Sequence, residues 1–302
     1  MLPPTQGMDT NRRQFLRHSL TVLGAAAAGE IACRAVRAAA GNEVPSGPAV
    51  PALTPDHQLV DARTGAPMPA ATDSARQGVP GRRWIMVIDL AKCDGCGTCI
   101  RACGKMHFIP PDRQWIKVLR MQESEKTAPY FFPQPCYHCD NPPCTKVCPV
   151  DATFKRSDGV VLIDNERCIG CRFCMAACPY GARSFNWGPP QNPPEAVAKG
   201  YSPEHGYPRR IGTVEKCDFC PDMAEMGMLP PCVGECPMAA MYYGDENEDA
   251  VTNSQGETQR LSQLLLDRSG YRQMEELGTN PRVYYLPPKN RMFAPPKLPT
   301  KD

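Results

Sequence analysis

The residues of this sequence with the most evident chemistry are its cysteines. Sixteen of the 17 cysteines lie between Cys93 and Cys236 and form four groups of four. Thiolates bind iron and zinc, so the spacing inside each group decides which metal site to expect. In chain order the groups are Cys93, Cys96, Cys99 and Cys103; Cys136, Cys139, Cys144 and Cys148; Cys168, Cys171, Cys174 and Cys178; and Cys217, Cys220, Cys232 and Cys236.

Every group begins with C-x2-C and ends with C-x3-C. The first and third groups read C-x2-C-x2-C-x3-C, whereas the second and fourth have a wider middle gap. A proline follows the last cysteine in all groups but the first. Bacterial ferredoxins use this spacing for [4Fe–4S] clusters, so we predict four such clusters with all sixteen cysteines as iron ligands. Zinc is the main alternative, but its sites usually combine two separated C-x2-C pairs. The repeated spacing also disfavours a disulfide framework.

The last cysteine of a group ligates the other cluster in two-cluster ferredoxins, so the groups must be paired. Groups two and three are joined by a short link, 149–167, which predicts a hairpin of 153–155 and 160–163. We therefore predict that groups two and three form one unit, with groups one and four nested around it. The alternative pairs group one with two and group three with four, and the spacing alone does not exclude it. The nested ligand sets are Cys93, Cys96, Cys99 with Cys236; Cys217, Cys220, Cys232 with Cys103; Cys136, Cys139, Cys144 with Cys178; and Cys168, Cys171, Cys174 with Cys148.

The elements that position these groups are duplicated. A predicted strand at 84–90 precedes group one, and another at 160–163 precedes group three. Gly95 and Gly170 occupy matching places, where a left-handed backbone would let amides approach the sulfurs. We expect each fourth cysteine at the start of a helix that leads away. The predicted fold is α+β and loop-rich, with two pseudo-symmetric ferredoxin-like dicluster units, near 84–150 and 159–238.

The composition agrees with a metal-stabilised fold. The chain has 302 residues and a net charge of +2, which gives no reason to expect nucleic acid as a partner. Each cluster with its four thiolates carries about −2, so four would add about −8. With 34 prolines, 24 glycines and only 22 aromatic residues, metal ligation should supply much of the folding free energy.

The N-terminus reads as a targeting segment. Arg12 and Arg13 precede a weakly apolar stretch, 19–28, and Ala38 to Ala40 offer a cleavage site. We predict a twin-arginine signal peptide over residues 1–40. Cys33 would be discarded with it, since Glu30 argues against lipidation. Residues 41–80 then form a Pro/Ala/Gly-rich arm, and no later segment is apolar enough to span a membrane.

The remaining sequence predicts a four-cluster domain at 81–244, with a loop insertion at 188–212, and a C-terminal docking tail at 245–302. A short helix is expected at 261–266 and a strand at 283–286. His138 could tune a cluster by hydrogen bonding, but a surface or packing role is the favoured expectation. Several cations near cysteines, such as Lys216, could offset cluster charge. The sequence has no Gly-rich nucleotide loop and no convincing nucleophile–base set, which argues against a substrate-converting site.

Three segments resemble a known family. They are Cys136 to Cys144 (CYHCDNPPC), Cys168 to Tyr180 (CIGCRFCMAACPY) and Leu277 to Tyr285 (LGTNPRVYY). They look like the four-cluster iron–sulfur subunits of respiratory oxidoreductases, such as the dimethyl sulfoxide, polysulfide and tetrathionate reductases, formate-dependent nitrite reductase and sulfite-reduction-associated complexes. The resemblance covers about 82–290 and supports the nested pairing. Some relatives replace one cysteine and hold a [3Fe–4S] cluster, whereas here all sixteen positions are cysteine.

The resemblance also implies partners. They are a membrane subunit that handles quinone and a catalytic molybdopterin or multihaem cytochrome subunit. We therefore expect a periplasmic electron-transfer subunit, not an enzyme by itself, that passes electrons through its clusters. A free-standing multi-cluster carrier is the alternative, and a structural metal scaffold is a third possibility.

Overall fold

The computed structural model describes residues 51–54, 59–66, 73–125 and 127–289. The chain divides into a unit of Met1–Pro48 and a unit of Ala49–Asp302, and every element named below belongs to the second. The predicted signal peptide with Cys33 lies outside the described residues, and so does the chain from residue 290.

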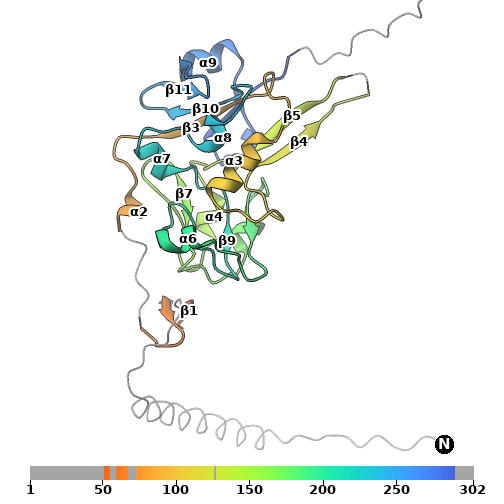
Figure 1. Ribbon diagram of the computed structural model, residues 1–302. Coiled ribbons are helices and arrows are strands. Elements are labelled where there is room, and N and C mark those ends of the chain that lie inside the picture. The colour runs from red at the N-terminus through yellow and green to blue at the C-terminus, as the bar shows by residue number, and fades with distance from the viewer. Residues whose placement is uncertain (1–50, 55–58, 67–72, 126, 290–302) are drawn as a thin grey trace, which may run out of the picture. The chain divides into compact units, whose positions relative to one another are not determined.

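A six-stranded sheet forms the largest regular element of the described chain (Figure 1). Its strand order is β12-β11-β10-β3-β14-β13. Only β14 runs parallel to its neighbour β3; the other pairs are antiparallel. The strands predicted near Trp84 and Val283 are confirmed, and they lie side by side. The bounds are β3 Trp84–Asp89, β10 Met241–Asp245, β11 Ala250–Asn253, β12 Thr258–Arg260, β13 Tyr271–Arg272 and β14 Val283–Leu286.

Strand β3 is buried along its whole length because both faces of the sheet are covered. Side chains alternate between the faces of a strand. Met86 and Ile88 pack into the core that contains the cysteines, whereas Ile85 and Val87 pack against the helix α9, Leu261–Asp267. The predicted helix at 261–266 is therefore confirmed, and β3 joins the C-terminal part of the chain to the cysteine region.

The rest of the fold consists of short strand pairs. The hairpin predicted between groups two and three is confirmed as β6, Thr153–Lys155, with β7, Val161–Ile163. Gly159 takes φ +89° in its turn. The other pairs are β1 Pro51–Leu53 with β2 Leu59–Asp61, β4 Lys117–Met121 with β5 Tyr130–Gln134, and β8 Ser184–Phe185 with β9 Val214–Glu215.

The helices are short, as expected for a loop-rich α+β fold. Besides α9 they are α2 Asp73–Gln77, α3 Thr98–Met106, α4 Pro143–Lys146, α5 Phe173–Ala176, α6 Pro194–Lys199, α7 Pro221–Glu225, α8 Pro231–Gly234 and the 3-10 turn Glu275–Leu277. The insertion at 188–212 is more regular than expected, since Pro194 begins α6, a position that suits proline. Within the described ranges, no helix has the length and apolarity needed to cross a bilayer.

Arg282 ties the C-terminal strand to the cysteine region. Its side chain is buried and donates to the carbonyl of Trp84 at 2.8 Å. Its Nη1 lies 3.2 Å from Asp140, next to Cys139, and 3.3 Å from Glu246. One guanidinium thus holds three segments that are far apart in the sequence.

We expect Arg282→Met to lower the stability of the folded chain by roughly 1–3 kcal/mol, because a buried carbonyl and two carboxylates lose their shared donor. Thermal unfolding of the cluster-loaded protein measures this as a melting temperature lower by several degrees. Arg82→Met is the matched control. Arg82 also pairs with two carboxylates but is 37% exposed, so its loss should leave the melting temperature nearly unchanged. Equal melting temperatures for the two variants would contradict the structural role given to Arg282.

Candidate metal centres

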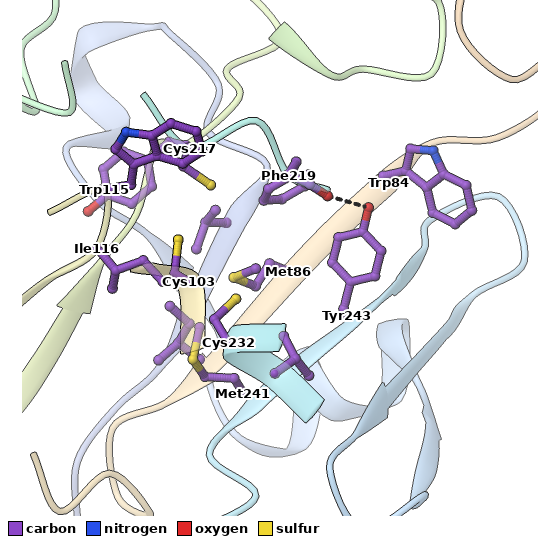
Figure 2. Close-up of a cluster of buried hydrophobic side chains, with 14 of the residues drawn as sticks. Trp84, Met86, Cys103, Trp115, Ile116, Cys217, Phe219, Cys232, Met241 and Tyr243 are labelled. Carbon is purple, nitrogen blue, oxygen red and sulfur yellow. Dashed lines mark hydrogen bonds between the residues drawn. The ribbon is translucent and has the colours of Figure 1, made fainter. Parts of the chain in front are cut away.

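The sixteen cysteines lie in four sets, each with three members from one group and one from another. We name these sets A to D and give their members at the end of this paragraph. In sets A, C and D, the four cysteines of the set line a cavity of their own. The cysteines of set B are all buried in the core, and Figure 2 shows three of them near Met86 and Met241. Set A is Cys93, Cys96, Cys99 and Cys236; set B is Cys103, Cys217, Cys220 and Cys232; set C is Cys136, Cys139, Cys144 and Cys178; set D is Cys148, Cys168, Cys171 and Cys174.

These sets coincide with the nested grouping. Cys103, which no proline follows, lies near Cys217 and Cys232. Burial raises the pKa of its thiol, and the charges of these two cysteines raise it further. Cys99 of its own group instead neighbours Cys93 and Cys236. Iron ligation by each set stays a prediction.

The loop between the first two cysteines of each group repeats one backbone geometry. The residue before the second cysteine has positive φ in all four groups: Gly95 (+77°), His138 (+42°), Gly170 (+72°) and Phe219 (+71°). A Cβ on Gly95 would lie 2.4 Å from the Phe131 ring, so glycine is needed there.

Groups two and four lack glycine at this place, and their two side chains contact each other. The rings of His138 and Phe219 stack with centroids 4.3 Å apart. His138 is buried, not at the surface: its Nε2 donates to the Cys217 carbonyl at 3.0 Å, and its Nδ1 accepts from the Val161 amide at 2.9 Å. His138 therefore serves packing, one of the roles expected for it, and fixes group four against β7.

The predicted helix after each fourth cysteine is wrong. The third cysteine of each group lies in a short helix, and Cys148, Cys178 and Cys236 follow two residues after α4, α5 and α8 end. Cys103 lies inside α3, because Gly104 replaces the proline and the helix continues to Met106.

Backbone amides point at two of the exchanged cysteines. The amide of Ala152 donates to the Cys148 sulfur at 3.2 Å, and that of Ala240 donates to the Cys236 sulfur at 3.4 Å. Both bonds span four residues, so the two halves of the chain repeat them. Such amides favour a negatively charged sulfur, as iron-bound thiolate requires.

Set B has a polar neighbour that the sequence analysis did not predict. His107 Nε2 lies 3.3 Å from the Cys220 sulfur, and its Nδ1 lies 3.3 Å from a carboxylate oxygen of Asp218. All three residues are buried, and burial raises the pKa of the Asp218 carboxyl and of the Cys220 thiol. In the sequence, the only sign that His107 lies near a cysteine set is its position four residues after Cys103. Arg183, five residues after Cys178, was missed in the same way; it lines the cavity of set C.

The cysteines fit the predicted clusters by their chemistry. All sixteen are free thiols, so the disulfide alternative fails for the described chain. Burial raises the pKa of Cys93 to about 11, although the Gly95 amide lowers it, and burial raises that of Cys139 and Cys217 to about 12. Without metal these thiols are protonated at neutral pH, so metal binding releases protons and compensates for burial.

Comparison with known proteins identifies the metal. Three families described as 4Fe-4S dicluster domains match residues 92–152, 127–191 and 160–237. These ranges include all sixteen cysteines. The chain therefore binds several [4Fe–4S] clusters, and its cysteines are consistent with four.

Similar proteins give the wider context. A selenate reductase subunit from Mesobacillus selenatarsenatis is 42% identical over 219 residues, which cover 68% of this chain and 72% of that protein. A tetrathionate reductase subunit from Salmonella typhimurium is 34% identical, over 70% of this chain and 74% of its own. Protein NrfC of Escherichia coli is 33% identical, over 69% and 82%. The chain belongs to the family of [4Fe–4S] iron–sulfur subunits that carry electrons in respiratory reductase complexes.

Proposed function

We propose that the chain relays electrons through four [4Fe–4S] clusters, held by sets A to D, between a quinone-linked membrane subunit and a catalytic or cytochrome subunit. A [4Fe–4S] cluster, when bound, accepts and donates one electron at a time. The observation that carries the proposal is the continuous order of the four cysteine sets through the fold.

Cysteines of neighbouring sets lie close enough to interact, and these contacts place the four sets in one spatial order. The pKa of Cys232 in set B is raised by burial and by other thiolates, among them Cys99 of set A. Cys217 of set B is affected in the same way by Cys136 of set C. Cys144 of set C and Cys174 of set D pack in one apolar cluster. The order A, B, C, D supports a linear path with set B in its interior.

The two ends of this order reach the surface. Cys96 of set A is exposed, whereas every cysteine of set B is buried. Next to set D, Phe173 is 60% exposed and Trp187 is 70% exposed. Electron exchange with other proteins needs clusters near the surface, so the ends support docking of two partners.

The predicted partners and location belong to this proposal. The partners are an integral-membrane quinone-interacting subunit and a molybdopterin or multihaem cytochrome subunit. The proposed location is the periplasmic side of the membrane, supported by the twin-arginine pattern. The domain layout is also proposed: signal peptide 1–40, arm 41–80, four-cluster domain 81–244 and docking tail 245–302, whose strands β11 to β14 join the sheet of β3.

The nested ligand sets predict which double variants are redundant. Cys103→Ala and Cys217→Ala should each remove about four of about sixteen iron atoms per chain, and the double variant should still lack only about four. Cys103→Ala with Cys136→Ala should lack about eight, because these residues belong to sets B and C. Iron and sulfide analysis of purified chains measures both. The reverse result would favour the pairing of group one with group two.

The relay predicts association with a membrane partner. The tagged chain, extracted from membranes in mild detergent, should co-purify with an integral membrane protein. Added quinol should reduce its clusters, as seen by electron paramagnetic resonance, whereas the isolated chain should not be reduced by quinol. A chain that purifies alone from the membrane fraction would point to the free-standing carrier.

Export predicts a defined mature chain. Replacing Arg12 and Arg13 by lysine should keep the protein in the cytoplasm at full length, because the twin-arginine pair is read by a receptor. Cell fractionation with mass spectrometry of the N-terminus measures this. The unaltered protein should begin at Gly41, and an acylated Cys33 would contradict the predicted cleavage.

A further inference from the structure

Arg183 differs from the other buried arginines of the described chain. Arg156, Arg209 and Arg282 are also buried, and each forms an ion pair with at least one carboxylate. Arg183 is only 7% exposed, yet no carboxylate of the described residues lies within ion-pair distance of it. Its Nη1 donates to the neutral Thr153 hydroxyl at 3.2 Å, and its Nη2 has no hydrogen-bond partner among the described residues.

The charge of Arg183 faces cysteines instead. The residue lies just before β8 and lines the cavity of set C. Burial would lower the pKa of its guanidinium, but the thiolates of Cys144, Cys174 and Cys136 hold it above its usual range. Cys144 and Cys136 belong to set C, and Cys174 belongs to set D. Arg183 therefore stands between two neighbouring cysteine sets.

A buried charge without a partner costs several kcal/mol, and a guanidinium does not deprotonate to avoid this cost. The compensating charge must come from what the cysteines hold. A [4Fe–4S] cluster with its four thiolates carries about −2, so two such neighbours would supply the missing partner.

We propose that Arg183 has the clusters of sets C and D as its counter-ions and thereby raises the reduction potentials of both. The inference rests on the proposed ligand sets. Reduction adds one negative charge to a cluster. A fixed positive charge in a low-dielectric surrounding stabilises the reduced form more than the oxidised form.

Sets A and B have no buried arginine against their cysteines in the described chain. After Cys103 the chain places His107 against set B, whereas after Cys178 it places Arg183 against set C. Lys216 is a second buried cation, near Cys144 of set C and Cys217 of set B. Unlike Arg183, its ammonium donates to two backbone carbonyls, those of Val161 and Cys217. Arg183 thus adds a buried positive charge to the half of the proposed relay formed by sets C and D.

The test compares Arg183→Gln with Arg183→Lys in the cluster-loaded chain. Potentiometric titration followed by electron paramagnetic resonance gives the potential of each cluster. In Arg183→Gln the equilibrium constant for reduction should fall by about tenfold for one cluster, which is about 59 mV for one electron, and by less for a second. The other two should stay unchanged. Arg183→Lys should restore most of the difference because it keeps the charge.

Two matched controls separate charge from local packing. Thr153→Val removes the hydrogen bond of Arg183 but not its charge, so all four potentials should stay near their original values. Arg101→Gln removes an exposed guanidinium that donates to the Cys96 carbonyl of set A at 3.0 Å. Its effect should be smaller and should vanish at high salt, whereas the effect of Arg183 should persist because a buried charge is poorly screened.

Each outcome decides the inference. Unchanged potentials in Arg183→Gln with full iron content would overturn it. Loss of iron in Arg183→Gln but not in Arg183→Lys would support the counter-ion role, and loss in both would overturn it. An unaltered protein without reducible clusters would instead defeat the proposed relay itself.

Discussion

The fold depends on an exchange of cysteines between loops that are far apart in the sequence. Set A needs Cys236 and set B needs Cys103, so residues 93–103 and 217–236 complete each other. The same exchange joins sets C and D through Cys178 and Cys148. Short helices and two-stranded pairs cannot bury much apolar surface alone, so the proposed cluster ligation by these sets would supply a large share of the folding free energy. The sheet around β3 covers the resulting core on one side.

The duplication is visible in the backbone more than in the side chains. All four groups have positive φ before the second cysteine, but only groups one and three use glycine there. In groups two and four, His138 and Phe219 adopt the strained conformation, and their stacked rings join sets B and C at the centre of the proposed path. The strain of a non-glycine residue is tolerated because each ring gains a buried contact that glycine lacks.

Residue patterns within short segments correctly predicted strands, hairpins and helices that form from those segments. The strand at Trp84, the hairpin around Gly159 and the helix at Leu261 follow from residue patterns, and cysteine spacing predicted the metal. Contacts between segments that are far apart in the sequence were harder to predict. Cys148, Cys178 and Cys236 lie after short helices because the proline that follows each of them begins a turn instead of a helix. His107 and Arg183 were missed because their importance depends on which distant cysteine each one meets, and no pattern in one sequence reports that.

Charge compensation explains how such a chain can keep many ions in its interior. Arg156, Arg209 and Arg282 each meet carboxylates and connect distant segments, so these arginines hold the scaffold without involving the metal sites. Arg183 differs because it pairs with no carboxylate of the described residues, and the sulfurs of sets C and D are its charged neighbours. An apo chain would therefore contain an uncompensated cation between two cavities, and cluster binding would remove that cost. The same interaction that stabilises the loaded fold then favours an added electron at sets C and D, so stability and electron distribution depend on one buried charge.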